Sequence, residues 1–277
     1  MYEKELLALK KAGRFRQPIS ADFESIDMAS NDYLGLAHKP KLLKLTFKKL
    51  SKYPYYAPKS SLFVGGYHPI HQEFEVALCK ANQFEAGVVA GSGFLANLGL
   101  IEALVRKRDT LFVDESYHAS GMLATKLTQG KVVLFKHNDP DDLLKKLNST
   151  DVKGRRIIAV EGVYSMQGDM VKREFFEISK DYEALMIVDE AHSSGTVGAN
   201  LLGVFDYYNI KPSPFHIKMG TLGKAYGSYG AYILGSRKII SFLHNRAKSL
   251  IYTTAPSLFD IALASTNFNY IMKKKRN

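Results

Sequence analysis

AGVVAGSGFLANLGLIEALVRK (86–107) contains the unit from which the fold can be predicted. It begins with a short β-rich run that ends in a glycine turn, and it continues with apolar residues at helical spacing. The same alternation recurs between about Glu73 and Val204, with further strands predicted in TLFVDES (110–116), RRIIAVEGV (155–163) and LMIVDEAH (185–192), and helices in DDLLKKLN (141–148) and EFFEISKDYEA (174–184). Strands and helices at this spacing predict βαβ units, so the expected fold class is α/β with a mostly parallel central sheet covered on both faces.

Polar residues follow four of the predicted strands. They are Ser92, Glu115 to His118, Glu161 to Ser165, and Asp189 to His192. Open α/β sheets bind ligands beyond the carboxyl ends of their strands. We therefore expect these side chains to meet in one crevice.

The composition is that of an ordinary globular protein. Of 277 residues, 46% are hydrophobic and 23% charged, and the longest apolar runs are far shorter than the roughly 20 residues that a membrane-spanning helix needs. MYEKELLALKKAG (1–13) predicts a charged amphipathic helix and lacks the apolar core of a signal peptide. We expect a cytoplasmic protein without a membrane contact, and the single cysteine, Cys79, excludes an internal disulfide.

The net charge of +11 raises the possibility of a nucleic-acid partner. The lysines are spread along the chain in segments such as KPKLLKLTFKKLSK (39–52), which is typical of the solvated face of a helix, and the one dense cluster is KKKRN (273–277). We therefore expect no nucleic-acid partner.

Asp189-Glu190-Ala191-His192 also spells the metal-binding box of a class of helicases. Such a motor needs the phosphate-binding loop G-x-x-x-x-G-K-[ST], and the nearest segment, GTLGKAYGS (220–228), lacks the first glycine at the right distance and has Ala225 after the lysine. A metal bound by Asp189 and His192 fits poorly as well, because zinc sites usually add cysteines or a third histidine at short spacing. We expect neither a motor nor a metal.

Lys224 lies among small residues in MGTLGKAYGSYGAYILG (219–235), where its side chain could project into an open site. A desolvated lysine can form a Schiff base with a carbonyl cofactor, and pyridoxal 5′-phosphate would give the other strand-end groups a role. A buried carboxylate such as Asp189 would keep its pyridine nitrogen protonated, the helix N-terminus that GSGF (91–94) opens would suit its phosphate, and His118 could stack on its ring.

Six segments in order along the chain resemble the signature blocks of the α-oxoamine synthases. They are SNDYLGLA (30–37), GSGFLANLG (91–99), DESYHASG (114–121), EGVYSMQGD (161–169), VDEAHSSGTVG (188–198) and TLGKAYGSYGAYI (221–233). These fold-type I pyridoxal-phosphate enzymes condense an amino acid with an acyl thioester and release carbon dioxide. The resemblance implies their fold, their cofactor and their acyltransferase chemistry.

The resemblance also implies roles for individual residues. Lys224 would hold the cofactor and take the α-proton of the amino acid, Asp189 would pair with the pyridine nitrogen, and His192 and Ser165 would hydrogen-bond the phenolic oxygen. His118 would stack on the ring and donate a proton to the thioester carbonyl. The remaining implied positions are Ser92, Gly93, Phe94 and Thr221 around the phosphate, Thr254 reaching the phosphate of a neighbouring subunit in a homodimer with a shared active site, Asn31 on the substrate side, and Glu161 supporting the site.

Two features bear on the substrate and the domains. FKHNDPDDL (135–143) and GYHPIHQEFE (66–75) look most similar to the members that join L-alanine to a pimeloyl thioester carried by coenzyme A or acyl carrier protein; glycine-using, serine-using and 5-aminolevulinate-forming relatives are alternatives, as is a pyridoxal-phosphate-binding scaffold without catalysis. We predict an N-terminal helix and substrate-side segment over 1–40 and a cofactor-binding large domain over 41–277. The small C-terminal domain of the family is expected to be missing.

The chain departs from the family pattern at two positions. Gly223 stands where serine is common before the lysine, and PKSSL (58–62) lacks an arginine that many members carry. The first departure removes a hydroxyl near the expected phosphate site.

Overall fold

The computed structural model describes residues 1–274, so the last three residues of the basic run 273–277 lie outside the described part. The chain divides into two compact units, Met1–Ser30 and the part from Asn31 onwards. The first unit carries α1 (Glu3–Lys11), the amphipathic helix predicted from the sequence, which buries none of its residues.

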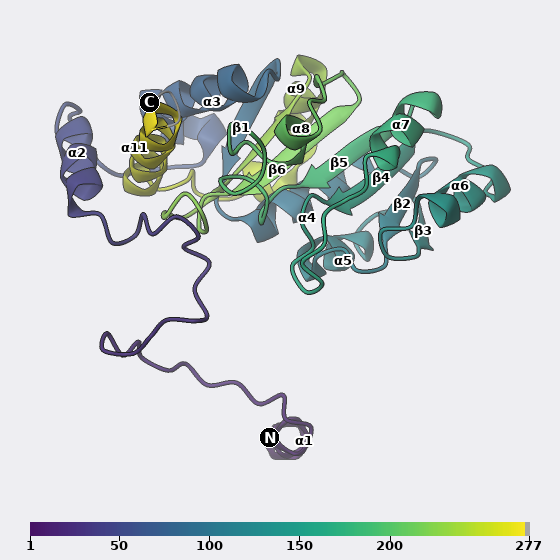
Figure 1. Ribbon diagram of the computed structural model, residues 1–277, viewed down its shortest axis with the longest axis horizontal. Coiled ribbons are helices and arrows are strands. Elements are labelled where there is room, and N and C mark those ends of the chain that lie inside the picture. The colour runs from purple at the N-terminus through teal and green to yellow at the C-terminus, as the bar shows by residue number, and fades with distance from the viewer. Residues whose placement is uncertain (275–277) are drawn as a thin grey trace. The chain divides into compact units, whose positions relative to one another are not determined.

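The second unit alternates helices and strands (Figure 1). Its elements are α2 (Pro40–Leu50), the short helical turn η1 (Leu62–Gly66), α3 (Pro69–Asn82), β1 (Ala86–Ala90), α4 (Gly93–Leu104), β2 (Thr110–Asp114), α5 (Ala119–Thr125), β3 (Lys131–Phe135), α6 (Pro140–Ser149), β4 (Arg156–Glu161), α7 (Glu174–Asp181), β5 (Leu185–Asp189), α8 (Val204–Tyr207), β6 (His216–Thr221), β7 (Ala231–Gly235), α9 (Arg237–Arg246), α10 (Lys248–Ile251) and α11 (Leu258–Lys274). Every strand and helix that the sequence predicted between residues 86 and 192 is confirmed, and α5 and β3 are additions.

The strands form one seven-stranded sheet in the order β1-β7-β6-β5-β4-β2-β3. Neighbours from β6 to β3 pair in parallel, whereas β7 pairs antiparallel with both β1 and β6. The expected mostly parallel sheet is therefore confirmed. All strands except β7 end at the same edge, and the β4–β5 register places Glu161 beside Asp189 there.

Two apolar clusters, one on each face, hold the sheet between its helices (Figure 1). Along β5, Met186 and Val188 belong to the cluster that includes residues of α3 and α11, while Leu185 and Ile187 belong to the cluster that includes residues of α4 and α10. This alternation follows from the two-residue period of a strand. Burial on both faces makes the strand apolar throughout, as expected for a covered parallel sheet.

A buried ion pair lies close to the carboxyl end of β5. Glu190 and Lys218 are fully buried, with Lys218 Nζ 3.5 Å from Glu190 Oε1. Lys218 also donates to Asn82 Oδ1 (2.8 Å), and Glu190 Oε2 accepts the Val204 amide (2.8 Å). Glu190, the second residue of the Asp189-Glu190-Ala191-His192 segment, is therefore part of the buried core. Removing either partner of the ion pair would leave an uncompensated buried charge.

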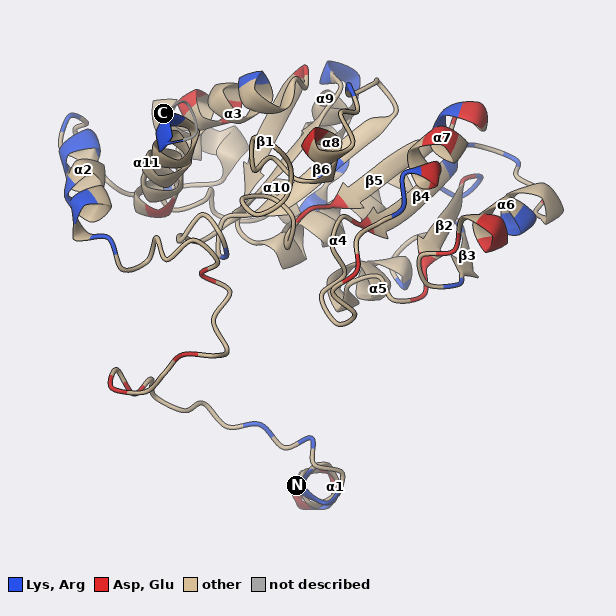
Figure 2. Ribbon diagram, in the orientation of Figure 1, with Lys and Arg blue, Asp and Glu red and all other residues tan. Residues whose placement is uncertain are grey.

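Lysine and arginine residues are distributed over several elements, including α2, α6, α7 and α9, rather than gathered on one (Figure 2). This distribution agrees with solvated helix faces. Within residues 1–274, no helix has both the length and the apolar character needed to cross a membrane.

Candidate functional site

The predicted crevice is a cavity of about 180 Å³ at the carboxyl edge of the sheet. Its lining comes from the carboxyl ends of β4, β5 and β6 and from segments after β1, β2, β5 and β6. It consists of Gly93, Phe94, Asn97, His118, Glu161, Asp189, Ala191, His192, Met219, Thr221 and Lys224. A larger hollow of about 740 Å³ lies between α2 and α11, but it holds none of these side chains. The small cavity is therefore the candidate functional site.

Asp189 ends β5 at the cavity and is almost completely buried. Its Oδ2 accepts a hydrogen bond from Asn97 Nδ2 (2.7 Å) and its Oδ1 accepts one from the Ala191 amide (2.9 Å). Burial raises the pKa of Asp189, while these two hydrogen bonds and the nearby Lys224 oppose the rise. The carboxylate is fixed in orientation and is available to a cationic group in the cavity.

Lys224 and His192 form a hydrogen-bonded pair. Lys224 Nζ lies 2.6 Å from His192 Nε2, and His192 Nδ1 lies 2.7 Å from the hydroxyl of Tyr33. That hydroxyl donates its one proton to Asn31 Oδ1 (2.9 Å), so His192 must donate from Nδ1 to Tyr33 and accept from Lys224 at Nε2. The structure therefore links Asn31, a predicted substrate residue, to the lysine through Tyr33, which the sequence analysis did not single out.

Burial lowers the pKa of both partners in this pair. The pKa of His192 falls to about 4, with the charges of Lys224 and His118 adding to the effect of burial. The pKa of Lys224 is also lowered by burial, against the opposing charges of Asp189 and Glu161. A lowered pKa favours the neutral amine that a nucleophile or proton acceptor needs.

Glu161 ends β4 in the cavity wall and is 2% exposed. Its Oε2 accepts the Ser165 amide (3.2 Å), and its Oε1 has no hydrogen-bond partner among the described residues. Burial, and then the charge of Asp189 on the neighbouring strand, raise the pKa of Glu161 to about 8. At neutral pH the Glu161 side chain is therefore a neutral acid.

Glu161→Gln should raise the stability of the protein relative to the unchanged chain, and this gain should grow as the pH rises. The unfolded chain loses the Glu161 proton near pH 4.5, but the folded chain keeps it up to about pH 8, so the stability that the neutral acid provides is present below pH 4.5 and is lost as the pH rises to 8. Glutamine does not titrate. We expect the free energy of unfolding of the variant to gain about 2–4 kcal/mol relative to the unchanged chain between pH 5 and pH 8.

Urea denaturation at both pH values measures this gain. The matched control is Glu183→Gln, at an exposed glutamate, which should show almost no change with pH. Parallel stability curves for Glu161→Gln and the unchanged chain would contradict the prediction.

The turn after β1 forms one end of the cavity, the end at which the sequence predicts a phosphate site. Ser92 caps α4, its Oγ accepting the Leu95 amide (3.2 Å), so the helix starts at Gly93 with its first amides at the cavity. Thr221, at the end of β6, lies across from it, with its Oγ1 3.9 Å from the position a Cβ on Gly93 would take. Backbone amides at a helix N-terminus favour a phosphate group.

His118 caps α5 and also lines the cavity. Its Nδ1 lies 2.7 Å from Ser120 Oγ and accepts the Ser120 amide (3.2 Å). His118 therefore caps α5 and faces the cavity at the same time.

Four predicted residues are outside the cavity lining, and one of them is Ser92, the N-cap of α4. Ser165 is exposed in the loop after β4, where its amide contacts Glu161. Thr254 is exposed and forms an isolated antiparallel bridge with Ser61. Asn31 reaches the cavity only through Tyr33 and His192. Their predicted contacts stay predictions.

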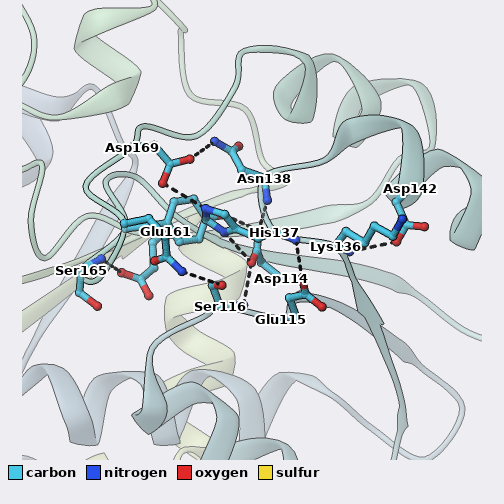
Figure 3. A network of polar contacts seen from close by, with 12 residues as sticks. Asp114, Glu115, Ser116, Lys136, His137, Asn138, Asp142, Glu161, Ser165 and Asp169 are labelled. Carbon is cyan, nitrogen blue, oxygen red and sulfur yellow. Dashed lines mark hydrogen bonds and ion pairs between the residues drawn. The ribbon is translucent and has the colours of Figure 1, made fainter.

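A polar network beside the cavity fixes the loop that carries Ser165 (Figure 3). The His137 ring lies between two carboxylates, with Nδ1 3.3 Å from Asp114 Oδ1 and Nε2 3.1 Å from Asp169 Oδ1. Asn138 donates to Asp169 Oδ2 (2.6 Å), and Tyr164 donates to Asp114 Oδ2 (2.7 Å). The network ties the loop after β4 to the ends of β2 and β3.

The donor set suits pyridoxal phosphate better than a metal. Within residues 1–274, no group of three or more His, Cys, Asp or Glu side chains is arranged to hold a metal ion. A lysine amine, a buried carboxylate and a helix N-terminus share one cavity, and they match the aldehyde, the pyridine nitrogen and the phosphate of the cofactor. Cys79 takes no part, since burial raises the pKa of its thiol to about 11.

A family model of the class I and II aminotransferases matches residues 24–273. The chain belongs to this family, and within it to the pyridoxal-phosphate-dependent α-oxoamine synthases. The 8-amino-7-oxononanoate synthase of Helicobacter pylori strain J99 is 46% identical to it over 277 residues, which cover all of this chain and 74% of that protein. The putative 8-amino-7-oxononanoate synthase of Aquifex aeolicus is 37% identical over 255 residues, covering 91% of this chain and 67% of that protein.

Solved structures agree with the fold. Serine palmitoyltransferase from S. paucimobilis superposes with a TM-score of 0.87 at 24% identity, covering 99% of this chain and 75% of that one. The 8-amino-7-oxononanoate synthase of Francisella tularensis has a TM-score of 0.74 at 29% identity, covering 91% of this chain and 70% of that one. The fold-type I architecture expected from the sequence is confirmed.

Proposed function

We propose that the chain catalyses the decarboxylative condensation of L-alanine with a pimeloyl thioester. The products are 8-amino-7-oxononanoate, carbon dioxide and the free thiol of the carrier. The relatives that are 46% and 37% identical support this choice of reaction through their names. The observation that carries it is the presence of Lys224 and the buried Asp189 in one cavity.

We assign the cofactor contacts by the chemistry of each group. Asp189 would face the pyridine nitrogen, His118 the ring, and Lys224 the aldehyde carbon, while Thr221 and the amides of Gly93 and Phe94 would hold the phosphate, and His192 and Ser165 the phenolic oxygen. When bound, pyridoxal phosphate supplies an electron sink for the charge left on the α-carbon of the amino acid.

Lys224 is proposed to move the α-proton. Its lowered pKa favours the neutral amine, and His192 Nε2, which accepts one of its hydrogens, keeps the nitrogen directed within the cavity. A general base of this kind works best when its pKa approaches the working pH. After accepting the proton, the ammonium group would be balanced by Asp189, the first of the carboxyl groups whose charge raises the pKa of Lys224.

We propose a homodimer in which Thr254 reaches the phosphate site of the partner subunit. Its support is the exposure of Thr254, together with the short bridges from residues 60 and 61 that fix the segment, including the Ala255 amide donating to the Ser60 carbonyl (3.0 Å).

Substrate comparison tests the proposed reaction. Purified chain is mixed with pyridoxal phosphate and with alanine, glycine or serine, and thiol release from pimeloyl-coenzyme A and from pimeloyl-acyl carrier protein is then followed. We expect alanine to exceed glycine about 10-fold or more in kcat/KM, because one methyl group in a fitted pocket is worth that much discrimination. A preference for glycine or serine would contradict the substrate assignment, and binding of the cofactor without thiol release would indicate a scaffold.

A further inference from the structure

Asn97 joins the two sides of the cavity, although neither composition nor spacing singled it out. It lies on α4, is 1% exposed, and lines the cavity between Asp189 and His118. Its Nδ2 donates to Asp189 Oδ2 (2.7 Å) and to Ser120 Oγ (3.0 Å). Tyr117, also buried, donates from its hydroxyl to Asn97 Oδ1 (2.9 Å).

The hydrogens in this network can be assigned from the donors alone. Burial raises the pKa of Tyr117 well above its usual range, so its hydroxyl keeps its proton and donates it to Asn97 Oδ1. Asn97 then has two N–H groups, and Asp189 and Ser120 take one each. No part of the amide is free to rotate without breaking a buried hydrogen bond, which is costly in a water-excluded site.

The proton on the His118 ring can be assigned in the same way. Ser120 Oγ accepts from Asn97, so its own proton is directed to His118 Nδ1, 2.7 Å away. The backbone amide of Ser120, which can only donate, also points at Nδ1 (3.2 Å). An imidazole nitrogen that accepts two hydrogen bonds has no proton, and the ring proton is therefore on Nε2.

We infer that Asn97 and Ser120 are positioning residues that hold His118 in its Nε2–H form and tie it to Asp189. One amide then fixes both the acid that would face the ring nitrogen and the histidine on the cavity wall. The Nε2–H group makes His118 a hydrogen donor toward a ligand, which is the form required to stabilise charge on a thioester oxygen. This last consequence depends on the proposed function, whereas the position of the ring proton does not.

The decisive experiment is ¹⁵N NMR of the cofactor-free full chain with labelled histidine. Long-range ¹H–¹⁵N correlations distinguish a protonated from an unprotonated ring nitrogen, and His118→Gln identifies the signals of His118 among those of the eight histidines. We expect an unprotonated Nδ1 and a protonated Nε2. A protonated Nδ1 in the unchanged chain would overturn the inference whatever any variant does.

Ser120→Ala tests the relay itself. The change removes the hydroxyl donor to Nδ1 but keeps the backbone amide, so we expect the minor Nδ1–H form to increase about 2- to 10-fold, the worth of one hydrogen bond. Thr125→Val removes a hydroxyl from the same helix that donates only to the Met122 carbonyl, and it should leave the His118 signals unchanged. Equal spectra for Ser120→Ala and the unchanged chain would contradict a role for Ser120.

Asn97→Leu tests the link to Asp189. The change leaves Asp189 Oδ2 and Ser120 Oγ without their donor, and we expect the Kd for pyridoxal phosphate, measured by absorbance titration, to rise about 10-fold. Asn245→Leu, at an exposed asparagine on α9, is the control. If Asn97→Leu fails to fold, Asn97→Asp, which keeps the size of the side chain but adds a carboxylate beside Asp189, should weaken binding as well.

The histidine spectra and the cofactor Kd distinguish a failure of the positioning role from a failure of the proposed function. Failure of the unchanged chain to bind pyridoxal phosphate would count against the proposed function alone, because the histidine spectra need no cofactor. An unaltered cofactor Kd in a folded Asn97 variant would count against the positioning role alone.

Discussion

Lys224→Ala should lower kcat/KM by about 10⁴-fold or more. The change removes the amine that would attack the cofactor aldehyde together with the group that would take the α-proton, and a general base by itself contributes about 10²–10⁴-fold. His192 cannot replace the lysine readily, since its Nε2 is placed to accept from Lys224 and its pKa is about 4. Turnover is measured as thiol release from the pimeloyl thioester.

A second readout of Lys224→Ala needs no turnover. Borohydride reduction followed by peptide mapping should label position 224 in the unchanged chain and leave the variant unlabelled there. Lys248→Ala, which changes a largely exposed lysine paired with Glu102, should behave as the unchanged chain in both assays. Full activity of a folded Lys224→Ala protein would remove the basis of the proposed function.

Asp189→Asn should lower kcat about 10²–10³-fold, the usual cost of removing one preorganised electrostatic contact from a buried site. A neutral amide cannot stabilise a positive charge on the ring nitrogen. In addition, Asn97 Nδ2, which donates to a carboxylate oxygen of Asp189, would face either the oxygen or the NH₂ group of the new amide. We also expect weaker cofactor binding. Both quantities are followed by stopped assays of thiol release and by absorbance titration with pyridoxal phosphate.

Asp141→Asn, at an exposed position on α6, is the control for loss of one negative charge. Activity of Asp189→Asn within about twofold of the unchanged chain would show that the carboxylate does not face a charged ring atom.

The sequence allowed Lys224, Asp189, His192 and His118 to be predicted because each follows a strand or lies in a recognisable block. Their convergence required only that parallel strands end at one edge. The strand β3 was not predicted because it is an edge strand whose only buried residue is Phe135, and α5 because its seven residues are too few to show a helical period. Both lie where the pattern of burial is weakest.

The connecting residues could not be predicted from local pattern. Asn97 hydrogen-bonds a carboxylate 92 positions away, and Tyr33 hydrogen-bonds a histidine 159 positions away. These pairings exist only after folding, so no local sequence pattern indicates them. The same holds for His137, whose two carboxylate partners are the last residue of β2 and a residue of the loop after β4. Strand ends indicate where a site lies, whereas its hydrogen-bonded support comes from residues brought together by the sheet order.

The reversed direction of β7 sets the width of the site. As a spacer between β1 and β6, it holds these two strands two strand spacings apart, roughly 10 Å. Its own first residue enters at that edge after Gly230, where an added Cβ would come 3.2 Å from the Ala90 carbonyl oxygen at φ +118. A residue with a side chain at position 230 would therefore press on the last residue of β1, just before the turn that leads to the cavity, without touching any group proposed to react.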